Sequence, residues 1–252
     1  MKVALQLYTV RDKMAKDCLS TLQLVAEAGY RVVEFAGHPY GTLRAGELRR
    51  VLDGLGLKPL SAHIGFGLLE EKPRETLGYA SELGLEYIVS EPDMRRIDSL
   101  EKCLEAAEKM DALGEQARMQ GMRFGMHNHA IEFEKKFEGK TAYGILVENT
   151  DPKLVFFQLD VYWIRYAGYD PCKVIESLKG RCPLVHLKDM KDDVSKEMVE
   201  LGHGSMDFKA IVRSCEGSGT DWYIFENDRP SVDSIESIKI ALMYLKNNFP
   251  VE

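Results

Sequence analysis

The sequence predicts an α/β fold, a closed (β/α)₈ barrel built as one domain over residues 1–252. Short runs rich in Val, Ile, Leu and Phe alternate along the chain with longer amphipathic stretches, and there are eight of each. Several runs are almost continuously apolar, as parallel strands covered on both faces should be. Strict alternation implies a parallel sheet with right-handed crossovers, and eight such units close naturally into a barrel.

The apolar runs are short enough for strands, and the first begins close to Met1. An open doubly wound sheet is the alternative arrangement of such units. It usually carries a GxGxxG motif after its first strand, but LYTVRDKM stands there instead, which favours the barrel. The expected strands are Val3–Tyr8, Val32–Phe35, Lys58–Ala62, Tyr87–Val89, Arg123–His127, Leu154–Leu159, Pro183–Leu187 and Trp222–Phe225.

The stretches between these strands have apolar residues at helical spacing, and most end at a glycine. Gly56, for example, follows a stretch that places Leu48, Leu52 and Leu55 on one face. The polar segment Phe133–Thr141 is expected to form a surface excursion or small hairpin near the barrel mouth. The expected helices are Cys18–Ala28, Ala45–Leu55, Lys72–Leu83, Leu100–Gln120, Thr141–Glu148, Pro171–Leu178, Phe208–Glu216 and Asp233–Asn248.

The net charge and the cysteine content indicate which kinds of protein this chain is not expected to be. The formal net charge is -7, so there is no basic field to collect phosphate backbones, and nonspecific nucleic-acid binding is disfavoured. The five cysteines are widely spaced and include no CxxC pair, which is typical of free thiols in a reducing compartment. No signal-like segment precedes the first strand, and no apolar stretch approaches the ~20 residues of a membrane span. We therefore expect a cytoplasmic protein without a membrane partner.

Acid or imidazole side chains end four of the later apolar runs. Glu132 follows RFGMHNHAI, Asp160 follows LVFFQL, His186 follows CPLV and Glu226 follows WYIF. In a barrel, the C-terminal ends of the strands face one common cavity. An ionised carboxylate in such apolar surroundings is costly unless a cation is paired with it. Carboxylates with one imidazole and no thiolate predict one divalent metal ion, Mn²⁺, Mg²⁺, Co²⁺ or Zn²⁺.

Further titratable and aromatic residues fall at the same ends of the expected strands. Lys188 lies two residues beyond His186 and so points to the same side, where its ammonium can stabilise negative charge or move a proton. Asp189 is expected to brace the following loop. Trp163 is a candidate to stack on a sugar, with core packing as the alternative. The chain has six histidines, all expected to lie at this end of the barrel: His38, His63, His127, His129, His186 and His203.

The motifs LQLYTVRD, HNHAIEF, LDVYWIRYAGYDP, VHLKDM, LGHGSMDF and FENDRP span the whole chain. Together they resemble the xylose-isomerase-like TIM-barrel superfamily, often called sugar phosphate isomerases/epimerases, and most closely its inosose dehydratase-like branch. The resemblance implies metal ligands at Glu132, Asp160, His186 and Glu226. Many members of the superfamily have Glu where this chain has His127. In the alternative ligand set, His127 therefore binds the metal and Glu132 is a neighbour.

The resemblance implies a divalent-metal-dependent isomerase or epimerase that acts on a sugar or keto-sugar through an enediolate intermediate. His129, Lys188 and Glu226 are the candidate catalytic residues, and His63, His127, Trp163 and Lys188 the candidate substrate contacts. A lyase, such as an inosose-type dehydratase or a 3-keto-glycoside eliminating enzyme, shares the same intermediate. An endonuclease IV-like abasic-site nuclease is more remote, because the net charge disfavours DNA. A barrel that binds sugar without turnover and a homo-oligomer both remain open.

Overall fold

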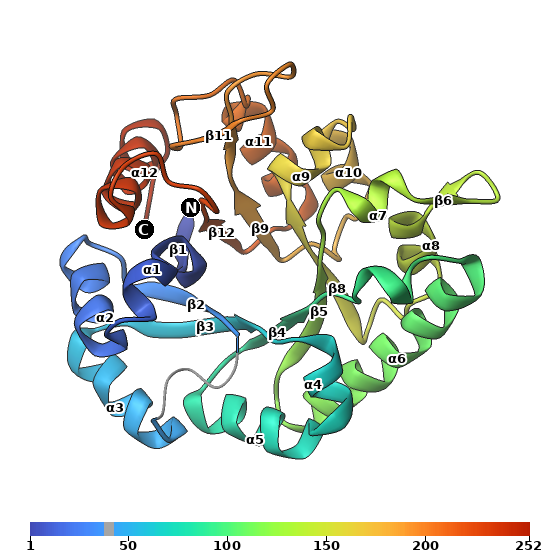
Figure 1. Cartoon of the computed structure of the whole chain (residues 1–252), viewed down its shortest axis with the longest axis horizontal. Coiled ribbons are helices and arrows are strands. Elements are labelled where there is room, and N and C mark those ends of the chain that lie inside the picture. The colour runs from blue at the N-terminus through green and yellow to red at the C-terminus, as the bar shows by residue number, and fades with distance from the viewer. Residues whose placement is uncertain (38–42) are drawn as a thin grey trace.

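A closed parallel barrel forms the centre of the molecule, as the alternation of apolar runs predicted (Figure 1). The computed structural model describes residues 1–37 and 43–252. Around the barrel the strands follow in the order β1-β12-β9-β8-β5-β4-β3-β2, and each pairs with its neighbours in parallel. The barrel strands are β1 (Lys2–Gln6), β2 (Val32–Ala36), β3 (Lys58–His63), β4 (Tyr87–Ser90), β5 (Arg123–His127), β8 (Val155–Asp160), β9 (Leu184–Leu187) and β12 (Trp222–Phe225).

Helices surround the barrel, and the largest hydrophobic core lies between them and the outer faces of the strands (Figure 1). Gly56 and Gly84 end α3 and α5 in the left-handed conformation, as the glycines after these stretches predicted. The covering helices are α2 (Cys18–Glu27), α3 (Ala45–Leu55), α5 (Pro73–Leu83), α6 (Leu100–Met119), α8 (Ala142–Glu148), α10 (Pro171–Ser177), α11 (Phe208–Ser218) and α12 (Ser234–Asn248).

The inside of the barrel has an apolar layer near the N-terminal ends of the strands. Its side chains form a separate buried cluster of Ala4, Leu60, Tyr87, Val89, Phe156, Leu184 and Ile224. Gly125 of β5 faces this cluster, and a Cβ added there would lie 2.4 Å from the Phe156 ring. The glycine in RFGMH is therefore needed so that Phe156 can fill the barrel at this level.

Short helices and two hairpins follow the C-terminal ends of the strands. The first strand ends at Gln6, earlier than expected, because Leu7–Val10 turns into the 3-10 helix η1. Segment 133–141 contains the expected hairpin, formed by β6 (Lys136–Phe137) and β7 (Lys140–Thr141). A second hairpin, β10 (Asp189–Met190) with β11 (Met198–Val199), follows β9. The remaining short helices, which were not predicted, are α1 (Arg11–Met14), α4 (Phe66–Glu71), η2 (Met94–Arg96), α7 (Ile131–Glu134) and α9 (Val161–Tyr166).

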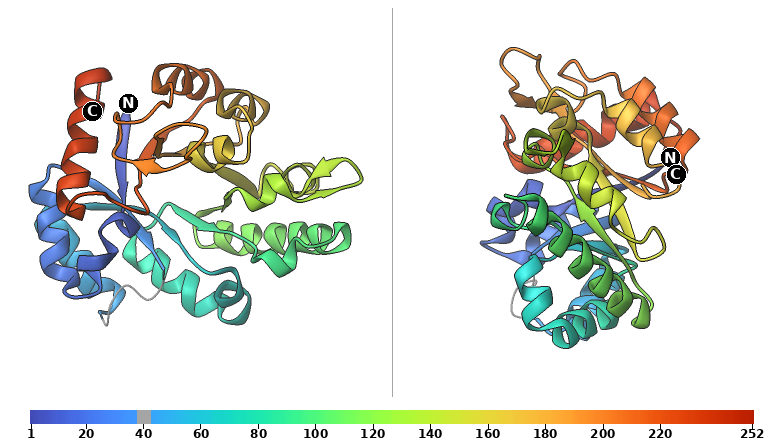
Figure 2. Two further views of the ribbon diagram at one scale, coloured as in Figure 1. Left: turned by 45° about the horizontal axis from the view of Figure 1, so that its top comes forward. Right: turned by 90° about the vertical axis from the view of Figure 1, so that its right-hand side faces the viewer.

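The two chain ends lie side by side in both views of Figure 2. The Met1 amino group donates to the Pro250 carbonyl oxygen at 2.7 Å, and the Glu252 N–H donates to the Met1 carbonyl oxygen at 3.0 Å. Among the helices of residues 1–37 and 43–252, none has the length and apolar content needed to cross a membrane.

Candidate metal and substrate site

A polar layer lies directly above the apolar layer inside the barrel. On β8, Phe156 belongs to the apolar cluster, and Gln158 and Asp160 follow it at intervals of two residues. His186 stands two residues after Leu184 on β9, and Glu226 two residues after Ile224 at the end of β12. Because side chains on one face of a strand recur every second residue, the apolar layer fixes these polar groups inside the barrel.

His127 and Glu226 of this polar layer line a cavity of about 1120 Å³ at the C-terminal end of the barrel, whereas Asp160 and His186 are fully buried and are not among its lining residues. An aromatic wall on α9, made of Tyr162, Trp163 and Tyr166, stands on one side. Six residues predicted from sequence to be functional contribute to the lining: His63, His127, His129, Trp163, Lys188 and Glu226. Large concave sites that combine aromatic walls with a few convergent polar groups are typical of small-molecule binding.

Four side chains could hold a metal ion between them: His127, Asp160, His186 and Glu226. One ligand atom from each lies within 4.8 Å of the others, and all four residues are buried. Nδ1 of His186 is 2.8 Å from Oε2 of Glu226, and Nε2 of His127 is 3.8 Å from Oδ2 of Asp160. Two imidazoles and two carboxylates are a donor set that suits a divalent transition metal such as Zn²⁺.

Asp160 provides an independent sign that this group fits a cation. Its Oδ1 caps α9 by accepting from the backbone N–H groups of Tyr162 and Trp163. Its Oδ2 is buried and accepts no hydrogen bond of good geometry from the described residues, although Nζ of Lys188 is 3.0 Å away. A buried carboxylate oxygen with spare acceptor capacity suits a metal ion.

Glu132 lies outside this group, contrary to the first of the two expected ligand sets. It belongs to the short helix α7, and its Oε2 accepts from the backbone N–H of His129 at 2.8 Å. Burial raises the pKa of Glu132. His127 ends β5 with its side chain inward, whereas the helical turn after it directs Glu132 back to the backbone. The fold therefore assembles the alternative set, with His127 as the fourth candidate ligand.

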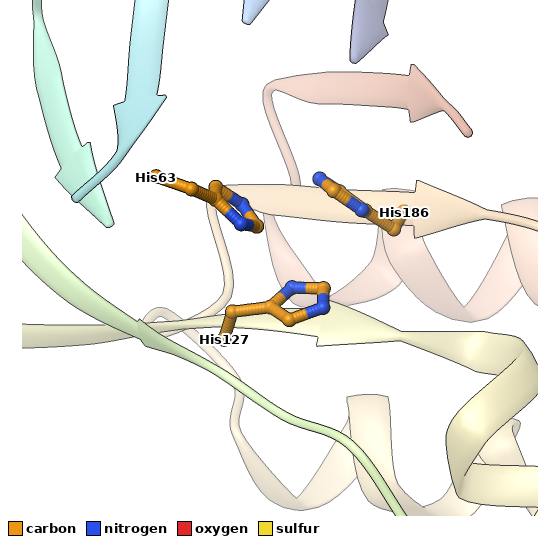
Figure 3. A group of neighbouring side chains, drawn as sticks. All are labelled: His63, His127 and His186. Carbon is orange, nitrogen blue, oxygen red and sulfur yellow. The ribbon is translucent and has the colours of Figure 1, made fainter. Parts of the chain in front are cut away.

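Three imidazoles converge from three strands, as Figure 3 shows for His63, His127 and His186. The ring of His186 stacks on that of His63 with centroids 5.3 Å apart, and the His127 ring is 4.7 Å from both. These three could also hold a metal. However, Nε2 of His63 and Nδ1 of His127 already contact Oε1 of Gln158, at 2.7 and 3.0 Å. The four-residue group is therefore the better metal site.

Glu34 of β2 is completely buried and contacts several residues of the polar layer. Its carboxylate receives side-chain donors from Gln6, Ser61, Gln158 and His186 at 2.6 to 2.9 Å. Burial alone would raise its pKa, but the neighbouring imidazoles of His63 and His186 hold it well below the usual range. The carboxylates also act on His186. Burial alone would lower the pKa of this imidazole, but Glu34 and Glu226 raise it to about 10.

Lys188 is buried among three carboxylates. Its Nζ lies 2.7 Å from Oε2 of Glu226, 2.9 Å from Oδ1 of Asp228 and 3.0 Å from Oδ2 of Asp160. Burial would lower its pKa, but these negative charges raise it well above the usual value, so the ammonium stays charged. Burial alone would raise the pKa of Glu226, and Lys188 with His186 holds it well below normal.

The remaining candidate residues divide between the cavity and the surface. The His129 ring lies 5.1 Å from that of His127 and 5.7 Å from that of Trp163. Nε1 of Trp163 is buried without a hydrogen-bond partner among the described residues. His203 lies in the loop that follows β9, as expected, but it is exposed and is not among the residues that line the cavity. His38 falls outside the described residues.

Asp189 braces the loop after β9, as expected. Its carboxylate accepts from the backbone N–H groups of Met190, Gly202, Gly204 and Met206 at 2.9 to 3.2 Å. A Cβ at Gly204 would lie 2.3 Å from Oδ1 of Asp189, so this position requires glycine. The same loop carries residues 195–198, which line the cavity. Asp189 therefore holds one wall of the site in place.

The sequence interpretation missed four polar residues of the site. Gln158 and Asp228 contact His127 and Lys188, whereas Gln6 and Ser61 contact Glu34. For Gln158 a signal was present. It lies two residues before Asp160 within an apolar run, and period-two alternation therefore places both side chains inside the barrel. Ser61 gave a similar signal, because it lies two residues before His63. A register irregularity between β2 and β3 pairs it with Glu34.

Comparison with known proteins agrees with this fold. Residues 22–248 match the family model described as "Xylose isomerase-like TIM barrel". A sugar phosphate isomerase/epimerase from Parabacteroides distasonis ATCC 8503 is similar in structure, with a TM-score of 0.85 and 25% sequence identity. The alignment covers 98% of this chain and 94% of that one.

Two other similarities are more limited. An inosose dehydratase from Clostridium tetani is 26% identical over 149 residues, which are 51% of this chain and 48% of that protein. The chain thus spans about half the length of this curated relative. The structure described as the IOLI protein with a binding zinc atom has a TM-score of 0.78 at 16% identity, covering 98% of this chain and 97% of that one. At that identity the likeness concerns the fold alone.

Proposed function

The chain belongs to the xylose isomerase-like TIM barrel family, and on this basis we propose that it is a divalent-metal-dependent isomerase or epimerase of a sugar or keto-sugar. The observation that carries the proposal is the buried group of His127, Asp160, His186 and Glu226, of which His127 and Glu226 line a large cavity. Buried charge of this kind is costly for stability, so a functional reason for it is expected. The full-length similarity to a sugar phosphate isomerase/epimerase supports the same class.

The metal would be held by His127, Asp160, His186 and Glu226, and would polarise a carbonyl or hydroxyl oxygen of the substrate. Two imidazoles in place of one favour Zn²⁺ or Co²⁺ over Mg²⁺. The likeness in fold to a protein that binds zinc is consistent with this choice. The positive charge of Lys188 beside Asp160 and Glu226 would stabilise negative charge that develops on a substrate oxygen.

Proton transfer next to the carbonyl is the remaining requirement of this chemistry. Removal of that proton gives an enediolate, and its return to another carbon or to the other face gives isomerisation or epimerisation. We propose His129 for this transfer, because it lines the cavity next to the aromatic wall. Trp163 and Tyr166 would pack against the C–H face of the sugar, while His63 would hydrogen-bond its hydroxyl groups.

A second candidate is a lyase, favoured by the similarity to inosose dehydratases. A lyase would form the same enediolate and then expel a neighbouring hydroxyl or alkoxide group. Elimination would require an acid that protonates this leaving group. Lys188 and His129 both line the cavity and are the candidates for that acid.

A panel of free ketoses, inososes and 3-keto-glycosides, each incubated in D₂O with and without Zn²⁺ or Co²⁺, tests the proposal. An isomerase or epimerase yields a saturated product with deuterium at one reacting carbon, whereas a lyase yields an unsaturated product. Activity that survives complete removal of the metal on every active substrate would exclude both candidates. Cleavage of an abasic-site duplex, with no turnover in the panel, would instead support the remote nuclease alternative.

A further inference from the structure

A network of hydrogen bonds around the buried carboxylate of Glu34 leads to His127, and its donors and acceptors can be assigned one by one, beginning at Gln6. The backbone N–H of Tyr8 donates to Oε1 of Gln6 at 3.0 Å. A backbone amide can only donate, so Oε1 of Gln6 must be the carbonyl oxygen. The amide Nε2 of Gln6 therefore faces Glu34 and donates to its Oε1 at 2.9 Å.

The carboxylate of Glu34 can only accept, and this fixes the orientation of the Gln158 amide. Oε1 of Glu34 also accepts from Nε2 of His186 at 2.6 Å, and its Oε2 contacts Ser61 Oγ at 2.6 Å and Gln158 Nε2 at 2.7 Å. If the Gln158 amide were reversed, two oxygen atoms would face each other at that distance. The donor group of Gln158 therefore points to Glu34, and its Oε1 points to the imidazoles.

Oε1 of Gln158 then selects the protonated nitrogen of two histidines. It has no hydrogen to give, and it lies 3.0 Å from Nδ1 of His127 and 2.7 Å from Nε2 of His63. Both of these nitrogens must carry the hydrogen. A neutral His127 consequently has its lone pair on Nε2, the atom 3.8 Å from Oδ2 of Asp160 in the four-residue group.

The geometry points to Gln158 as a positioning residue that keeps His127 in the Nδ1–H tautomer, so that Nε2 is the nitrogen available to the metal. The inference rests on the proposed function for the identity of the metal site. Glu34 acts in the same way on His186: it accepts from Nε2 and leaves Nδ1 to face Glu226 at 2.8 Å. A histidine ligand that donates its other nitrogen to a fixed acceptor has the correct tautomer and ring orientation before the metal arrives.

The tautomer can be measured directly in the full-length protein labelled with ¹⁵N-histidine. Two-bond ¹H–¹⁵N spectra of the metal-free protein distinguish Nδ1–H from Nε2–H imidazoles, and a His127→Gln variant identifies the His127 signals. We expect wild-type His127 to show the Nδ1–H pattern. In Gln158→Met the Nε2–H form should appear, and Zn²⁺ affinity, measured by competition with a chelator, should fall about 10- to 100-fold.

Gln6→Met is the matched control. Like Gln158→Met it removes one amide donor from Glu34, but Gln6 makes no contact with His127 among the interactions of the described residues. We expect its His127 tautomer to be that of the wild type and its loss of Zn²⁺ affinity to be at least tenfold smaller than that of Gln158→Met. Equal losses in the two variants would instead assign the effect to the charge of Glu34 and overturn the inference.

Two other results would overturn the inference that Gln158 sets the tautomer of His127. One is an Nε2–H pattern for His127 in the wild-type protein, and the other is an unchanged His127 spectrum in Gln158→Met. If Gln158→Met does not fold, the wild-type spectrum still decides the tautomer. If the wild-type protein binds no Zn²⁺ or Co²⁺ at all, the proposed function fails, whereas the tautomer measurement in the metal-free protein still decides the role of Gln158.

Discussion

The two layers inside the barrel are built on the same strands but have opposite chemistry. In the lower layer, Phe156, Leu184 and Ile224 pack together in one apolar cluster. Two residues further along the same strands, Gln158, His186 and Glu226 are equally buried but form a network of hydrogen bonds and ion pairs. The lower layer stabilises the barrel, and the upper layer uses that rigid frame to hold charges that would be unfavourable alone. Substitutions in the lower layer should therefore mainly reduce stability, and substitutions in the upper layer should mainly reduce activity and metal binding.

The largest contrast is expected along β12. Glu226→Gln removes a candidate metal ligand that also contacts His186 and Lys188, and should lower kcat/KM at least about 10³-fold, or about 4 kcal/mol. Ile224→Val, two residues earlier in the lower layer, should cost about 1 kcal/mol of stability and leave kcat/KM near wild type. The substrate found in the panel provides the assay, and thermal unfolding the stability. Similar activity losses in both variants would break the contrast between the layers.

The second contrast concerns stability. Phe156→Ala should destabilise the protein by about 3–5 kcal/mol, because it empties the middle of the apolar cluster next to Gly125. Denaturant unfolding measures this loss. The metal affinity of the fraction that remains folded should be close to that of the wild type. A large loss of metal affinity at a small cost in stability would show that the lower layer also positions the site.

His127 and Glu132 provide a test within the upper end of the barrel. His127→Gln should weaken Zn²⁺ binding at least about 100-fold, since it removes one of four ligands. Glu132→Gln should change Zn²⁺ binding much less, because Glu132 contacts the backbone of His129. Isothermal titration of both variants measures the difference. The reverse order of effects would restore Glu132 to the ligand set.

The pH dependence of stability should also report on the upper layer. In the metal-free protein, Glu34 and Glu226 raise the pKa of His186 to about 10 from an ordinary value of 6.5. The paired imidazolium therefore contributes stability that is fully present below pH 6.5 and is lost as the pH rises through about 10. Relative to His186→Gln, the melting temperature of the chelated wild-type protein should accordingly decline from pH 6.5 to 10. A difference that stays constant over this range would contradict the raised pKa.

The smallest effect is expected on the cavity wall. Trp163→Phe keeps the aromatic face but removes Nε1–H, which is buried without a partner among the described residues. If this group donates to the substrate, KM should rise about fivefold, or about 1 kcal/mol, with little change in kcat. Steady-state kinetics with the panel substrate measures it, and an unchanged KM would leave Trp163 a packing residue only.

Much of this molecule was predictable because the governing signals are local. The apolar runs predicted the strands, and glycines such as Gly56 and Gly84 predicted where helices end. Period-two alternation put His186 and Lys188 on one side of one segment. Asp189 was expected to brace its loop and does so. The fourth ligand was left as two alternatives, because the sequence does not reveal whether the chain after β5 turns its Glu132 toward the cavity or back onto the backbone.

The sequence by itself determined the barrel, the family resemblance, and the positions of Asp160, His186 and Glu226 at the strand ends, since strand periodicity and burial act over a few neighbouring residues. Only the tertiary structure decided that His127 joins them and that the amides of Gln6 and Gln158 both donate to the carboxylate of Glu34. These contacts join segments as far apart as Glu34 and Gln158, which barrel closure brings within 2.7 Å of each other. Such a distance depends on the register of all the strands between them, and no local pattern encodes it.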